Sequence, residues 1–247
     1  FIAVPPWGAP VLPFFAGAPI IFSRPSFGSA GYTYFMYRNK LRALLSPAER
    51  KIFARLTTPQ KIQAYLDTLP INYERGGETY MSPRRMLKAK TAHCFEGALF
   101  AAAVLAYHGQ KPLLMDLRTV RPYQDHVLAL FRVNGLWGAI SKTNHVVLRY
   151  RDAVYLSPRE LALSYFHEYV ESDGRKSLRE FSNPFDLTRY PPERWVTAQE
   201  HLHWLVDTLD DSKHFPIAPK KNLRKLRTPS PFERKVMDIV EWKKTRR

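Results

Sequence analysis

The pattern of apolar and polar positions changes its period once along the middle of the chain. Between residues 92 and 107 an alanine- and leucine-rich run predicts a helix, which Gly109 ends as a C-cap. Apolar residues then alternate with polar ones, which predicts strands over 113–120, 125–133 and 136–140. The dipeptide Asn134-Gly135 favours a two-residue type I′ turn between the last two strands. We therefore expect an α+β fold in which helices pack on an antiparallel sheet.

Prolines mark further helix starts, since many of the 20 prolines follow a serine or threonine. In three places serine, proline and glutamate take the N-cap, first and third positions of a capping box, which satisfies the free amides of the first turn. We expect a longer helix from Pro192 to about Leu209. The other expected helices begin near Pro47, Pro59, Pro83, Pro158 and Pro231.

Three parts are expected along the chain. Residues 1–35 are predicted to form an irregular arm, because repeated prolines interrupt any signal peptide or membrane-spanning helix there. Residues 36–210 carry the periodic segments and form the main domain. Residues 211–247 form a basic extension with a short helix. One apolar stripe is expected to dock that helix on the body or on a partner, and it consists of Phe232, Val236, Ile239 and Val240.

Composition indicates a globular protein, with 45% hydrophobic and 24% charged residues. The formal net charge is +16, but residues 213–247 hold 12 basic against three acidic residues and so account for +9 of it. A solvated tail is therefore favoured over a binding site. Association with nucleic acid or an acidic partner is the minor alternative, and its densest basic cluster is Lys220, Lys221, Arg224, Lys225 and Arg227.

The single cysteine, Cys94, excludes an intramolecular disulfide and any all-cysteine zinc site. Lacking disulfides, the chain suits a reducing compartment, and we expect a cytoplasmic location. No cofactor, metal or transmembrane segment is implied. Cys94 also begins the predicted alanine-rich helix, where unpaired amides and the helix dipole favour a thiolate. The alternative is a buried thiol that acts as a small apolar side chain.

The predicted hairpin supplies a histidine for this thiol. A turn at Asn134-Gly135 sets His126 opposite Thr143 and Leu128 opposite Ser141, with all four side chains on one face of the sheet. A cysteine at a helix start and a histidine on a following strand is a common arrangement for thiol–imidazole catalysis. A hydrogen-bonded histidine at a strand start is the structural alternative for His126 alone.

Over roughly residues 58–166 the chain resembles the transglutaminase-like superfamily, whose papain-like fold is shared by transglutaminases and some bacterial cysteine peptidases. The matching order is a cysteine at a helix start, Gly109 and Pro112 beyond the helix, Asp125-His126-Val127 on a strand, and a Gly-Leu-Trp-Gly segment from residue 135. The resemblance implies a nucleophile at Cys94, a general base at His126, and amide or ester chemistry by a hydrolase or acyltransferase.

The third catalytic residue departs from the family pattern, because Ser141 stands where an aspartate is usual. Its hydroxyl is expected to accept the imidazole N–H, although it stabilises an imidazolium less than a carboxylate does. Asn144 would serve only if a bulge shifts the register by one residue, and Asp116 is expected on the opposite face. A catalytically weakened or inactive binding module is therefore the alternative function. His93 and Glu96 either line the site or are polar surface residues.

Overall fold

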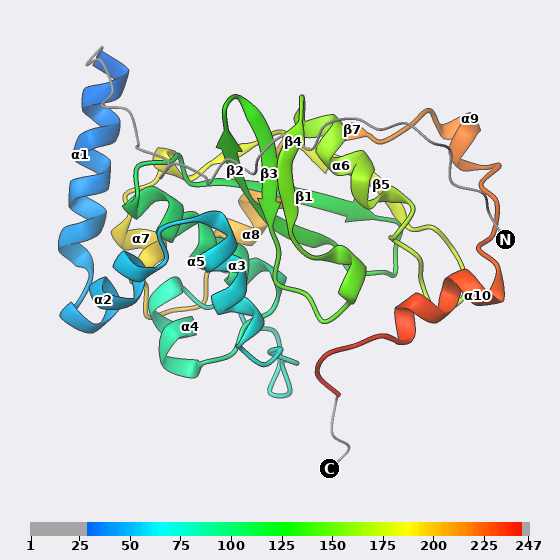
Figure 1. The fold of residues 1–247 in the computed structure, drawn as a ribbon, viewed down its shortest axis with the longest axis horizontal. Coiled ribbons are helices and arrows are strands. Elements are labelled where there is room, and N and C mark those ends of the chain that lie inside the picture. Colours follow the sequence, from blue (N-terminus) through cyan, green and yellow to red (C-terminus); the bar gives the residue numbers. More distant parts are fainter. Residues whose placement is uncertain (1–28, 244–247) are drawn as a thin grey trace, which may run out of the picture.

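The computed structural model describes residues 29–243, and these form a mixed α+β fold around one antiparallel sheet (Figure 1). The strand order is β4-β3-β2-β1-β5-β7, and β6 pairs with the start of β1. Every paired strand runs antiparallel to its neighbour. The strands are β1 Leu113–Thr119, β2 His126–Val133, β3 Leu136–Ile140, β4 Arg151–Tyr155, β5 Leu178–Ser182, β6 Phe185–Asp186 and β7 His214–Pro216.

Helices cover both faces of the sheet (Figure 1). On one face α5 lies along β2, and most of the remaining helices surround it, so that α5 becomes the axis of the larger apolar core. On the other face α6 closes a second core against β1, β2 and β5. The α-helices are α1 Ser29–Leu44, α2 Pro47–Arg55, α3 Pro59–Asp67, α4 Pro83–Ala89, α5 Cys94–Tyr107, α6 Pro158–Phe166, α7 Glu193–Val196, α8 His203–Asp210, α9 Lys220–Leu223 and α10 Pro231–Arg234. Short 3-10 turns are η1 Val146–Leu148, η2 Leu187–Arg189 and η3 Lys235–Asp238.

The alanine-rich sequence of α5 lets neighbouring elements approach it closely. Twelve of its 14 residues are buried, which leaves the helix almost no solvent-exposed face. Gly97 marks the tightest approach, since a Cβ there would lie 2.4 Å from the Cβ of Lys142. The Lys142 ammonium is itself buried and donates to the carbonyl of Leu66 in the last turn of α3 and to that of Leu69 just beyond the helix. These contacts join α5, α3 and the segment after β3.

Most predicted elements are confirmed. Helices begin at Pro47, Pro59, Pro83 and Pro158, and the three predicted strands correspond to β1, β2 and β3. The hairpin turn has φ of 50° at Asn134 and 85° at Gly135, which is the left-handed conformation that a type I′ turn requires. Its register pairs Ala129 with Ile140, as the turn predicts.

Other boundaries differ from the predictions. Residues 29–35 belong to α1, so the expected arm ends earlier, and its residues 1–28 lie outside the described part of the chain. The helix predicted from Pro192 to Leu209 is split into α7 and α8, because residues between them hydrogen-bond to the segment around Tyr80 instead. The main domain also extends past residue 210, since β7 pairs with β5.

The C-terminal apolar stripe is only partly covered by the body, since Val236 and Val240 are half-buried. Phe232 is 80% exposed and Ile239 is 57% exposed, and the helix there is one short turn followed by a 3-10 turn. The basic residues 220, 221, 224, 225 and 227 are exposed, while Leu223 and Leu226 pack partly against the core beneath α6. Across residues 29–243, no helix has the length and apolar character needed to cross a membrane.

Candidate active site

Cys94 is the first residue of α5, and its side chain is half-buried. A 14-residue helix directs its free backbone amides and the positive end of its dipole toward this position. The negatively charged form of the thiol is therefore favoured at this position. This location agrees with the sequence prediction and gives the sulfur a fixed position on the best-packed helix of the fold.

His126, the first residue of β2, is one of two histidines that lower the pKa of the Cys94 thiol. Its Nε2 lies 2.7 Å from the Ser141 hydroxyl, and that hydroxyl donates to the Leu148 carbonyl, also at 2.7 Å. Because the serine proton is used on Leu148, the hydroxyl accepts from the imidazole, and Nε2 carries a hydrogen. The other ring nitrogen, Nδ1, is left to face Cys94.

Gln63 holds Ser141 in place from α3. Its side-chain carbonyl accepts the Ser141 N–H at 3.0 Å, and its Nε2 donates to the Ser141 carbonyl at 2.9 Å. The same Nε2 donates to Asp67 at 2.9 Å, and the Gln63 side chain is buried. The backbone of Ser141, the residue just after β3, is therefore fixed, so the hydroxyl is directed at His126 in one orientation.

His93, the N-cap residue of α5, is the second histidine that lowers the pKa of Cys94. Its Nε2 lies 2.6 Å from the Thr79 carbonyl, which only accepts, so Nε2 is protonated and Nδ1 faces the thiol. Two carboxylates approach the same Nε2, Glu96 at 3.5 Å and Glu74 at 3.7 Å. The surroundings of His93 therefore favour an imidazolium beside the sulfur.

Glu96 anchors the loop that carries Thr79 to the start of α5. Its carboxylate is fully buried and accepts from the His93 N–H at 3.1 Å and the Met81 N–H at 3.0 Å. It also accepts from the Thr79 hydroxyl and from the Asn72 side chain, both at 3.1 Å. A buried carboxylate with this many donors is well satisfied and fixes the first turn of the helix relative to the loop.

The electrostatics of the site stabilise a thiolate. Burial by itself would raise the pKa of the Cys94 thiol, but hydrogen bonds and charges from His126 and His93 lower this pKa well below its ordinary value. Burial would likewise lower the pKa of His93, yet its hydrogen bond to Cys94, the charge of that thiolate and the nearby Glu96 raise this pKa to about 9. At neutral pH the favoured state is therefore a thiolate beside the His93 imidazolium.

The remaining sequence candidates lie apart from this pair. Asn144 makes its side-chain hydrogen bonds to Tyr73 and Trp242, so Ser141 alone of the two candidates bonds to His126. Asp116 lies opposite Val127 in the β1–β2 register and pairs through Oδ2 with His214 Nε2 at 2.9 Å, on the face away from His126.

Sequence analysis left His93 and Glu96 undecided and missed Gln63. The spacing His93-x-x-Glu96 was the available signal, because a residue just before a helix followed by glutamate at the third position is a capping-box arrangement. Burial, and after it the charge of Cys94, raises the pKa of the Tyr169 hydroxyl. Gln63 gives no local sequence signal.

Comparison with protein-family models and with curated proteins gave no match to this chain. The chemistry of the site therefore has to be argued from its own residues. Within residues 29–243, no group of three or more histidine, cysteine, aspartate or glutamate side chains is arranged to hold a metal ion. The arrangement provides a stabilised thiolate, two oriented imidazoles and the free amides of a helix N-terminus, which are the parts needed for attack on a carbonyl.

Proposed function

We propose that this chain is a thiol-dependent hydrolase or acyltransferase that acts on an amide or ester, with a transglutaminase-like active site. The observation that carries the proposal is the position of Cys94 at the start of α5, together with two histidines that lower its pKa and are each oriented by a separate acceptor. A thiol that served only as an apolar filler would not need such surroundings.

In the proposed reaction the Cys94 sulfur attacks the substrate carbonyl carbon and forms an S–C bond. Backbone amides at the start of α5 bind the developing oxyanion. His126, which took up the Cys94 proton when the thiolate formed, donates it to the leaving nitrogen or oxygen as the bond to the carbonyl carbon breaks, which leaves a thioester. His126 then removes a proton from water or an amine, whose attack on the thioester releases the product and regenerates the thiolate.

Ser141 is proposed to act as a positioning residue that holds the His126 ring through Nε2. In this role it takes the place of the aspartate usual in the resembling family. A hydroxyl supplies orientation without a negative charge, so the proposed enzyme relies on the His93 imidazolium to keep the sulfur ionised before it attacks the substrate. His93 thus compensates electrostatically for the absent carboxylate.

The test is the rate of Cys94 alkylation by iodoacetamide between pH 5 and 10, in wild type and in His126→Ala. Wild type is expected to react fast below the ordinary thiol pKa of about 8.5, and the variant to lose this advantage. Incubation with a p-nitrophenyl ester should also give an acyl adduct on Cys94, seen by intact mass, which then decays. Slow alkylation with an ordinary pKa in both proteins would contradict the proposal. Fast alkylation with no adduct would instead favour the inactive binding module.

A further inference from the structure

The segment 240–242 of the C-terminal extension pairs with backbone beside the candidate active site. Val240 forms an isolated antiparallel bridge with His145, and the Glu241 N–H donates to the Asn144 carbonyl at 3.2 Å. This segment therefore attaches as a short added strand. The attachment uses main-chain groups, in contrast to the partly exposed apolar stripe of the preceding helix.

Asn144 recognises one complete peptide residue of that segment. Its side-chain Oδ1 accepts the Trp242 N–H at 2.8 Å, and its Nδ2 donates to the Trp242 carbonyl at 2.9 Å. The Tyr73 hydroxyl donates to the same carbonyl and accepts from Asn144 Nδ2 at 3.1 Å. Since every residue carries an N–H and a C=O, this set of bonds fits any extended backbone.

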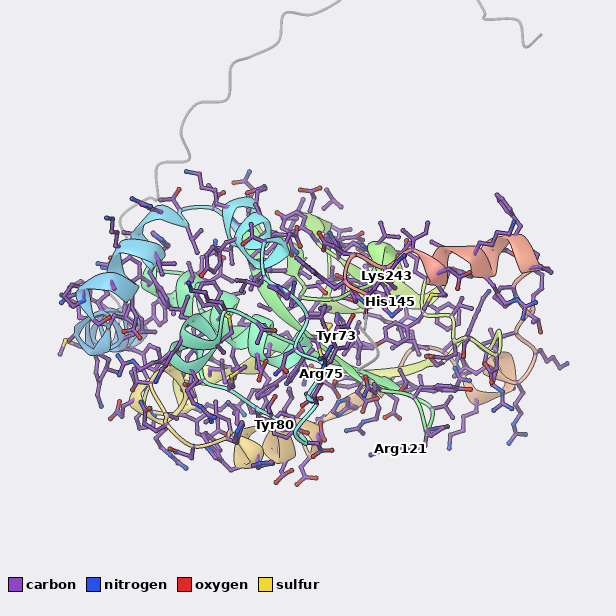
Figure 2. The ribbon with its side chains drawn as sticks, turned by 90° about the horizontal axis from the view of Figure 1, so that it is seen from below. Tyr73, Arg75, Tyr80, Arg121, His145 and Lys243 are labelled. Carbon is purple, nitrogen blue, oxygen red and sulfur yellow. The ribbon has the colours of Figure 1, made fainter. Side chains whose placement is uncertain are left out.

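The recognised backbone lies next to the catalytic residues. Asn144 follows Ser141 by three residues, and the charge of His126 contributes to lowering the pKa of His145 after the larger effect of burial. From the other side, Tyr73 follows Asn72, whose side chain bonds to the buried carboxylate in the first turn of α5. Figure 2 shows Tyr73 near His145 and the last described residue, Lys243, in agreement with these contacts.

Side-chain contacts add selectivity to the backbone bonds. The Glu241 carboxylate pairs with the Arg149 guanidinium, which also lies 3.8 Å from Asp67. Trp242 is half-buried where the segment that carries Tyr73 meets the segment that carries Asn144. An acidic residue followed by an aromatic one therefore matches this surface.

We infer that Tyr73, Asn144 and Arg149 form a peptide-binding subsite, that residues 240–242 fill it in cis, and that substrates are polypeptides whose acidic–aromatic segment replaces them. The substrate role rests on the proposed function, whereas peptide binding does not. A tethered occupant has an effective concentration on the order of 1 mM. If its intrinsic dissociation constant is about 0.1 mM, the tether weakens binding of an outside peptide by about tenfold.

The experiment measures fluorescence anisotropy of a labelled peptide with the sequence of residues 236–243, VMDIVEWK. It uses the full chain carrying Cys94→Ala, which prevents chemistry, with and without Trp242→Pro, which removes the N–H and the indole of the internal occupant. In the protein with Trp242→Pro, called the released protein below, the internal segment no longer fills the subsite. It should bind the peptide at least about tenfold more tightly than the protein without this substitution. Equal affinity for both proteins, or equal binding of a scrambled peptide, would overturn the inference.

Two further variants identify the subsite, and each is made in the protein that carries Cys94→Ala and Trp242→Pro. Asn144→Asp keeps the acceptor oxygen and side-chain size but removes both donors, so the affinity should fall by tenfold or more. Arg149→Gln and a peptide with glutamine in place of Glu241 should each weaken binding, and the two together should weaken it no more than either alone. Additive losses, or undiminished binding to Asn144→Asp, would place the peptide elsewhere.

These readouts separate the subsite from the catalytic proposal. Iodoacetamide is too small to need the subsite, and anisotropy needs no thiol. Peptide binding with an unreactive Cys94 would refute the proposed function and leave a peptide-binding surface. A reactive Cys94, together with no binding of the peptide to the protein that carries Trp242→Pro, would refute the subsite and leave the enzyme proposal standing.

Discussion

Replacing His93 by glutamine should raise the pKa of Cys94 and remove reactivity near neutral pH. The hydrogen bonds and charges around His93 move its pKa from an ordinary 6.5 to about 9, and Cys94 is the largest favourable cause. A difference of this size corresponds to about 3 kcal/mol of preferential stabilisation of the imidazolium. The interaction is reciprocal, so loss of the imidazolium destabilises the thiolate by a similar order.

His126 still stabilises the thiolate in the variant, so a rise of at least about one pKa unit is expected for Cys94. Alkylation by iodoacetamide at pH 6 should then slow by about tenfold or more. The charge of His93 has a second signature, since an imidazolium attracts anionic iodoacetate more than neutral iodoacetamide. The ratio of the two rates should fall in wild type as the pH rises through about 9, and should stay flat in His93→Gln.

The control is His108→Gln, which replaces the C-cap histidine at the other end of α5. The His108 Nε2 donates to the Phe53 carbonyl at 2.8 Å, at the end of α5 opposite to Cys94. This variant should retain the wild-type pH profile and rate ratio. If His93→Gln shows the same profile as His108→Gln, the electrostatic argument for the second histidine is wrong.

Three further changes test other parts of the fold. Ser141→Ala leaves the buried His126 N–H without its acceptor, so it should lower the free energy of unfolding by about 1–3 kcal/mol in urea titrations and slow alkylation. Burial lowers the pKa of Lys142 to about 8, so between pH 8 and 10.5 the unfolded chain binds more protons than the folded chain and the stability of the fold rises with pH. From pH 7 to 10.5 the free energy of unfolding of wild type should therefore rise by about 3 kcal/mol relative to that of Lys142→Met, measured by thermal unfolding. Asp116→Asn leaves the His214 imidazolium unpaired and should cost about 3 kcal/mol in urea, with an unchanged alkylation rate because the pair lies on the opposite face.

The Ser141–His126 contact was predictable from the sequence because it depends on local rules. Asn134-Gly135 specifies the turn, the turn specifies the register, and a period of two specifies the face of each side chain. These three steps use fewer than 20 consecutive residues. The same local rules located Cys94, since an alanine-rich run of this length forms a helix whose start is easy to find.

Contacts between distant segments were beyond these rules. His93 is oriented by Thr79, which belongs to a loop without periodicity, and the loop is held by hydrogen bonds to Glu96. The pairing of β5 with β7 joins residues more than 30 positions apart and determines where the domain ends. The bond between Asn144 and Trp242 spans 98 positions, and no pattern around either residue indicates it.

The burial of α5 on nearly every side determines how the nucleophile responds to stress. A helix with 12 of 14 residues buried opens only when the surrounding core opens, so its amides should exchange with deuterium at the rate of global unfolding. Some groups that orient the two histidines belong to loops instead, since Thr79 orients His93 and the segment after Ser141 bonds to Trp242 of the C-terminal extension. Heating should therefore loosen the orientation of the histidines before the fold is lost, and inactivation should precede melting.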